Sequence, residues 1–128
     1  MAQRIQNDQR RLRGSLSHHA GRAAEGAVAR DYARRGQPIA AERWRCAWGE
    51  IDLIARNGDE IVFIEVKQSR SHDEALSHLS QRQVDRIAAA AAVFLDGEPR
   101  GALTPVRFDV ALVDGQGRVK VLENFLAA

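Results

Sequence analysis

Residues 50–67 read EIDLIARNGDEIVFIEVK, two apolar runs separated by Asn57-Gly58-Asp59. A break containing Asn-Gly between two such runs is one of the strongest short-range signals for a β-hairpin with a tight turn. The sequence therefore predicts a strand over 50–56, a second strand over 60–67, and antiparallel pairing between them.

Side chains alternate between the two faces of a strand, so the turn decides whether Asp52 and Glu65 meet. A two-residue turn at Gly58-Asp59 would place them directly opposite each other, with Cβ atoms roughly 5 Å apart. A two-residue turn at Asn57-Gly58 would make them diagonal neighbours on one face. A three-residue turn would separate them. Either two-residue turn thus predicts two adjacent carboxylates.

Two adjacent carboxylates in a half-buried sheet need a compensating cation, because removing charge from water is costly. Two carboxylates suit Mg²⁺ or Mn²⁺, and Lys67, on the same face as Glu65, could assist an attacking water. Acid-x-Lys also occurs by chance, and charges on a strand face are most often solvated. Apolar residues on both faces of the strand over 60–67 favour a functional cleft, with Asp52, Glu65 and Lys67 as candidate catalytic residues.

The rest of the chain alternates helical and extended patterns. Helices are expected over 18–35 and 80–95, the second opened by a capping Ser80, and a loop over 68–78. Further strands are expected over 39–47, with Trp44 and Trp48 as large apolar anchors, and over 106–113 and 118–122. This order predicts an α/β fold, in which a central mixed five-stranded sheet is flanked by helices.

Length and composition indicate a single domain. With 128 residues and 45% apolar residues, the chain can form one modest core. We expect residues 1–17, rich in arginine, to be a flexible basic arm, either an unstructured end or a contact for nucleic-acid phosphates, and 18–128 to be the domain. The formal charge of +2 and pI of about 9.2 permit an anionic partner.

Cysteine content and hydropathy indicate the compartment. Cys46 is the only cysteine, so no internal disulfide and no cysteine-based zinc site can form. The longest uninterrupted apolar run, 87–95, is too short to span a bilayer. We expect a soluble cytoplasmic protein with no membrane partner.

Other charged residues are candidates of lower specificity. Glu25 lies at helical spacing with core residues, so its carboxylate either approaches the metal or pairs with Arg22 or Arg30. Arg82 and Arg86 share a face of the helix over 80–95 and either bind phosphate or are simply solvated. Asp109 lies within an apolar strand, which favours a structural pairing with an arginine.

Four segments together resemble the bacterial YraN family: GRAAE at 21–25, GEIDLIA at 49–55, FIEVK at 63–67 and RFDV at 107–110. That family is similar to the restriction-endonuclease-like PD-(D/E)XK superfamily, and most closely to archaeal Holliday junction resolvases. The resemblance implies a restriction-endonuclease-like fold. It also implies a site in which Glu25, Asp52 and Glu65 bind Mg²⁺ while Lys67 assists the water.

The expected function is Mg²⁺- or Mn²⁺-dependent hydrolysis of DNA phosphodiester bonds, with branched or single-stranded DNA as substrates. Arg82, Gln83 and Arg86 are candidate substrate contacts, although Gln83 replaces a lysine that is typical of the family. The alternative is a nucleic-acid-binding or accessory protein that keeps the nuclease fold without turnover. A homodimer would suit the cleavage of a junction.

Overall fold

The computed structural model describes residues 21–125. The basic arm predicted for 1–17 lies outside the described residues, as do the first positions of the predicted helix over 18–35. In the described part that helix covers 21–34. The other elements are β1 (Ile39–Cys46), β2 (Gly49–Asn57), β3 (Glu60–Gln68), α2 (His72–Ser77), α3 (Gln81–Leu95), the short 3₁₀ helix η1 (Gly101–Leu103), β4 (Val106–Val113) and β5 (Val119–Leu122).

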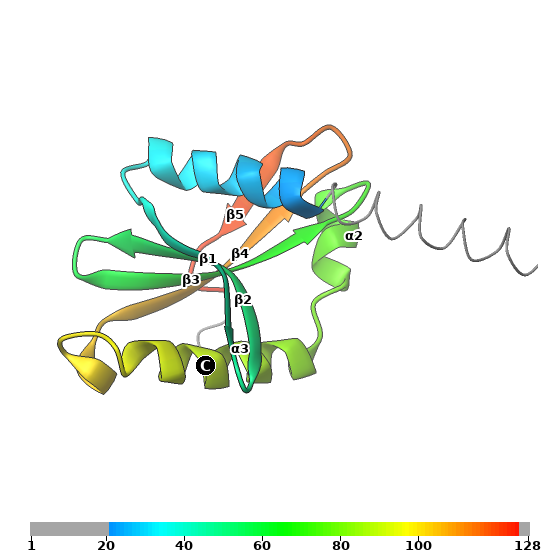
Figure 1. The fold of residues 1–128 in the computed structure, drawn as a ribbon. Coiled ribbons are helices and arrows are strands. Elements are labelled where there is room, and N and C mark those ends of the chain that lie inside the picture. Colours follow the sequence, from blue (N-terminus) through cyan, green and yellow to red (C-terminus); the bar gives the residue numbers. More distant parts are fainter. Residues whose placement is uncertain (1–20, 126–128) are drawn as a thin grey trace, which may run out of the picture.

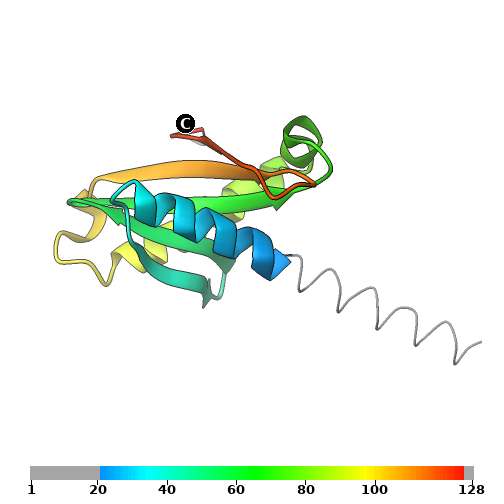
Figure 2. The ribbon, with the colours of Figure 1, turned by 90° about the horizontal axis from the view of Figure 1, so that it is seen from above.

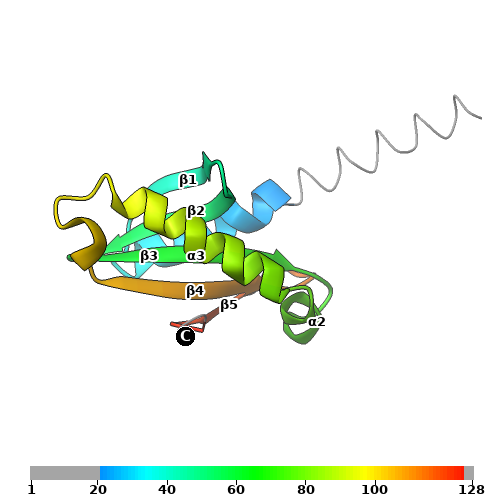
Figure 3. The same ribbon diagram turned by 90° about the horizontal axis from the view of Figure 1, so that it is seen from below.

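The strands form one mixed sheet in the order β1-β2-β3-β4-β5. Only β3 and β4 run parallel, and the other neighbours are antiparallel. The helix over 21–34 covers one face of the sheet (Figure 2), and α3 crosses the opposite face (Figure 3). The predicted α/β architecture with a central mixed five-stranded sheet flanked by helices is therefore confirmed.

Alternation along β3 supplies a core on both faces of the sheet. Val62 and Ile64 pack under the helix over 21–34, where Val28 and Tyr32 are fully buried. Ile61 and Phe63 pack on the other face against α3, through residues such as Ala90, Ala91 and Phe94. A central strand covered on both faces is apolar on both, which explains its continuous apolar run.

Two sequence expectations were wrong in this region of the fold. The segment predicted as a loop over 68–78 contains the helix α2, which Ser71 caps by accepting a hydrogen bond from the Glu74 N–H. A helix of six residues is too short to show a clear helical period. Trp48 was expected to anchor the core, but it lies in the turn between β1 and β2 and is 60% exposed.

The helix over 80–95 was predicted correctly. Its first turn is closed by a capping box, in which the Ser80 side chain accepts from the Gln83 N–H and the Gln83 side chain accepts from the Ser80 N–H. Cys46, the one cysteine, ends β1 and is half-buried.

Candidate active site

The turn between β2 and β3 sets the geometry of the site. Asn57 pairs with Glu60, so Gly58 and Asp59 form the two-residue turn, and Gly58 has the positive φ of 60° that such a turn favours. This is one of the two registers that the sequence predicted. The paired ladder runs back to Leu53 and Ile64, and the next position along both strands is that of Asp52 and Glu65.

Asp52 takes the place of a strand partner at the open end of this ladder. Its carboxylate Oδ2 accepts a hydrogen bond of 2.8 Å from the backbone N–H of Val66. The Asp52 side chain therefore accepts from a backbone N–H of β3 at a point where the backbone of β2 no longer pairs with it. This contact ties Asp52 to β3 beside Glu65.

The partner strand is irregular at the same level. Arg43 would face Asp52 between two paired positions of β1 and β2, but these two residues do not join the ladder, and Arg43 has a φ of 47°. Residues three apart on either side of this point pack on the same face of the sheet, which breaks strict alternation in both strands. These residues are Ala41 and Trp44 in β1, and Ile51 and Ile54 in β2.

Burial dominates the electrostatics of the two carboxylates, and the charges of neighbouring acids add to its effect. Burial, followed by the neighbouring Asp52 carboxylate, raises the pKa of Glu65 to about 7, despite the opposing effect of Lys67. Burial also raises the pKa of Asp52 to about 6, while the hydrogen bond from Val66 lowers it. Both groups thus favour the neutral form far more than a solvated carboxylate does.

Lys67 accompanies the pair. Its ammonium Nζ lies 3.4 Å from Oε1 of Glu65, and the two side chains are only 15% and 11% exposed. Lys67 lowers the pKa of both carboxylates, so it offsets part of the negative charge of the pair.

The carboxylates face a hollow of about 310 Å³ between the sheet and α3. Glu50, Asp52 and Glu65 line it from the sheet, and Gln83, Arg86 and Ile87 line it from α3. Two of the three predicted substrate contacts, Gln83 and Arg86, therefore lie at the hollow. Arg82 is exposed and does not line it, and the side-chain Oε1 of Gln83 is used in the helix cap.

Glu50 is a site residue that the sequence analysis did not select. It shares a strand with Asp52 at a spacing of two, which was the available signal. Its carboxylate pairs with Arg45 at 3.4 Å, across the β1–β2 ladder. Glu50 therefore adds a third acid to the wall of the hollow.

Glu25 is held by a residue that the sequence analysis did not consider. Its Oε2 accepts from Nε of Arg43 at 2.9 Å, and its side chain is 19% exposed. Neither expected partner, Arg22 or Arg30, forms this pair. Within residues 21–125, no three His, Cys, Asp or Glu side chains gather closely enough to share one ion. Asp52 and Glu65 lie side by side, and Glu25 is near enough to Asp52 for its negative charge to raise the Asp52 pKa.

Two further charged groups are structural. Asp109 is fully buried and accepts hydrogen bonds from Tyr32 Oη at 2.6 Å and from Arg107 at 2.9 and 3.0 Å, which confirms the predicted pairing with an arginine.

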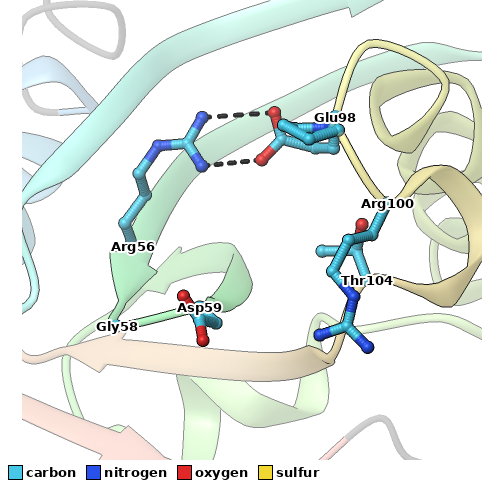
Figure 4. Close-up of a pocket in the computed structure, with 7 residues that line it drawn as sticks. Arg56, Gly58, Asp59, Glu98, Arg100 and Thr104 are labelled. Atoms are coloured by element: carbon cyan, nitrogen blue, oxygen red, sulfur yellow. Dashed lines mark hydrogen bonds and ion pairs between the residues drawn. The ribbon is translucent and has the colours of Figure 1, made fainter.

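At the far end of the sheet, a hollow of about 240 Å³ is bordered by Arg56 and Glu98, whose side chains meet face to face (Figure 4).

The charges around this second hollow are balanced. Asp59 and Arg100 also border it, so two acids face two bases. The Arg56–Glu98 pair ties β2 to the segment after α3. We therefore assign it a structural role.

No helix within residues 21–125 is long and apolar enough to cross a membrane.

Comparison with a family model and with known proteins points to the same family. The model of the family described as "Uncharacterised protein family UPF0102" matches residues 24–113. A UPF0102 protein of Cereibacter sphaeroides strain KD131 is 62% identical over 117 residues, covering 91% of this chain and all of that protein. A UPF0102 protein of Ruegeria pomeroyi is 60% identical over 112 residues, covering 88% and 91%.

A more distant relative covers nearly the whole chain. The UPF0102 protein of Roseobacter denitrificans is 45% identical over 127 residues, which is 99% of this chain and 98% of that protein. The segment matched by the family model, residues 24–113, contains Asp52, Glu65 and Lys67. The chain therefore belongs to the UPF0102 family, which is YraN-like as the four sequence segments indicated.

Proposed function

We propose that this protein is a metal-dependent endonuclease that hydrolyses DNA phosphodiester bonds, with a restriction-endonuclease-like fold of the PD-(D/E)XK type. The observation that carries the proposal is the Asp52–Glu65 pair. Glu65 is buried and Asp52 is half-buried beside it, the pKa values of both are raised, and both face a hollow. A buried pair of acids costs stability and is typical of a site that binds or reacts.

The donor set fits a hard divalent cation. Carboxylate oxygens are the ligands that Mg²⁺ and Mn²⁺ prefer, and Mg²⁺ commonly uses one or two carboxylates together with waters and substrate phosphates. Asp52 and Glu65 would hold the ion, with Glu50 at the wall of the same hollow. When bound, the ion would neutralise the two carboxylates, lower the pKa of a bound water and polarise a phosphate.

The chain's own residues have distinct roles in this proposal. Lys67, 3.4 Å from Glu65, would orient the attacking water and stabilise charge on the phosphate. Arg86, in the opposite wall, would hold a phosphate of the strand. The Val66 N–H fixes the Asp52 carboxylate in place, so that it needs little reorganisation.

Cleavage assays test this proposal directly. Labelled branched, flapped and single-stranded DNA would be incubated with the full chain and Mg²⁺ or Mn²⁺, beside Asp52→Asn and Glu65→Gln. We expect metal-dependent cleavage that falls by at least about a hundredfold in either variant. Glu98→Gln is the matched control, because it neutralises an acid at the other hollow. Cleavage that survives in Glu65→Gln would contradict the proposal.

One observation favours a second candidate. Glu25, the third expected ligand, is held by Arg43, which leaves two carboxylates at the core of the site. The alternative function is nucleic-acid binding without turnover. It predicts DNA binding that Glu65→Gln and Lys67→Met do not weaken, in a protein that cleaves none of the substrates with either metal.

A further inference from the structure

The turn between β1 and β2 presents a tryptophan to solvent. Cys46 pairs with Gly49, so Ala47 and Trp48 form the turn, and Gly49 has a φ of 137° that a side chain would strain. Trp48 is 60% exposed. By contrast, Trp44 on the same hairpin packs edge-on against Phe94, with ring centroids 5.4 Å apart. The hairpin thus anchors one indole and exposes the other.

The turn that carries the exposed indole is close in the chain to the candidate active site. Trp48 is two residues before Glu50, which lines the hollow that holds Asp52 and Glu65. Two residues span at most about 7 Å of chain, and one DNA strand advances about 3.4 Å per stacked nucleotide. A strand with a phosphate at the hollow would therefore carry a base to the turn within about two nucleotides.

The surroundings of Trp48 suit a nucleic acid better than a protein partner. The second pair of the hairpin from the turn is charged: Arg45, whose side chain is 76% exposed, and Glu50. A stable protein interface needs a broad apolar patch, which one indole among charged groups does not supply. Base stacking needs only one aromatic face with a cation nearby for the backbone, and Arg45 and Arg86 provide such cations.

We propose that Trp48 stacks on an unpaired nucleobase of the strand bound at the Asp52–Glu65 hollow, and so makes the protein select DNA that has unpaired bases. This inference rests on the proposed function. In a duplex each base is already stacked between its neighbours, so the indole gains a partner only where a base is free. Single strands, flaps and open junctions meet this condition.

Binding experiments on the full chain carrying Lys67→Met, with Mn²⁺ present, test the proposal with little hydrolysis, because that change is expected to slow cleavage and to keep the ion. The probes are a fluorescein-labelled oligothymidylate and a blunt duplex of the same length, followed by anisotropy. We expect Trp48→Ala to weaken oligothymidylate binding about tenfold, within a range of about 5- to 150-fold for one stacked base. Duplex binding should change less than about twofold, and Trp48→Phe should retain most of the single-strand affinity.

Two further measurements separate stacking from a general loss. Leu103→Ala removes an even more exposed apolar side chain from η1, and it should leave binding of both probes unchanged. In Trp44→Phe the remaining fluorescence comes from Trp48, and oligothymidylate should quench it. Absence of quenching, an unweakened Trp48→Ala, or equal losses on both probes would each overturn the proposal.

These outcomes are distinguishable from failure of the nuclease proposal. If the protein cleaves no DNA but Trp48→Ala selectively loses oligothymidylate, the stacking inference stands and the proposed catalysis is wrong. If Glu65→Gln abolishes cleavage while Trp48→Ala binds and cleaves single strands as the wild type does, the catalysis stands and the stacking inference is wrong.

Discussion

Replacing Glu65 by glutamine should make the metal-free protein more stable at neutral and alkaline pH, although it removes one of the two carboxylates of the Asp52–Glu65 pair. The pKa of Glu65 rises from 4.5 to about 7 on folding, first because of burial and then because of Asp52. An ionised Glu65 is therefore a cost to the folded state. Glutamine has nearly the same shape, carries no charge, and its amide can donate to the Asp52 carboxylate.

The sign of the pH dependence follows from linkage. Between about pH 4.5 and pH 7 the folded state binds more protons at Glu65 than the unfolded state does, so stability falls as the pH rises. The free energy lost by pH 8 is roughly 3 kcal/mol for a pKa difference of this size. Below pH 4.5 the carboxyl group is protonated in both states and the cost disappears.

Urea unfolding in EDTA, followed by circular dichroism, measures this difference. We expect Glu65→Gln to exceed the wild type by roughly 2 kcal/mol at pH 8 and to differ little at pH 4.5. Added Mn²⁺ should stabilise the wild type and reduce the gap, because an ion that binds only the folded state stabilises it.

Glu98→Gln is the control with the opposite sign. Arg56 lowers the pKa of Glu98, so neutralising Glu98 should destabilise the protein at pH 8. The reasoning about Glu65 would be refuted if Glu65→Gln were less stable than the wild type at pH 8 in EDTA. An increase that is the same at pH 4.5 and pH 8 would also refute it, because charge burial would then not be the cause.

Three other substitutions separate structural from catalytic roles. Tyr32→Phe removes a 2.6 Å hydrogen bond to the buried Asp109 and should cost about 1–3 kcal/mol of stability, measured by urea unfolding; an unchanged midpoint would contradict this. Lys67→Met should slow cleavage about a hundredfold, while calorimetry should show that Mn²⁺ still binds. Loss of both cleavage and Mn²⁺ binding would mean that Lys67 supports the ion and not the attacking water. Asp52→Asn can still accept from the Val66 N–H, so it should be more stable than Asp52→Ala by about 1–3 kcal/mol; equal stabilities would dismiss that hydrogen bond.

Local signals in the sequence predicted the centre of the fold well. The Asn57-Gly58-Asp59 break lies between its own two strands, so the turn depends on adjacent residues alone. The two-residue turn and the alternation of side chains then fix Asp52 next to Glu65, and the structure adopts one of the two expected registers. The capping box at Ser80 was predictable for the same reason, because its partner is three residues away.

Two features of the site region were not predictable, for different reasons. Glu25 pairs with Arg43, which lies on another element and has a positive φ that no local sequence rule indicates. Trp48 looks like a core residue by composition, and only the point at which β1 and β2 close into a turn shows that it is exposed. The Glu25 pairing comes from tertiary structure, whereas the Trp48 turn is local but was missed because neither Ala47 nor Trp48 is a residue type typical of turns.

The costs to stability converge on one part of the sheet. At the Asp52 position, pairing with β3 ends and pairing with β1 is interrupted, and Arg43 takes a backbone conformation that costs about 1–3 kcal/mol. The buried Glu65 adds the cost of its charge. Packed cores on both faces of the sheet offset these terms. A hairpin with only a structural role would not be expected to keep these destabilising features, and the charge-balanced hollow beside Arg56 has none of them. We therefore expect chemistry at the Asp52–Glu65 pair.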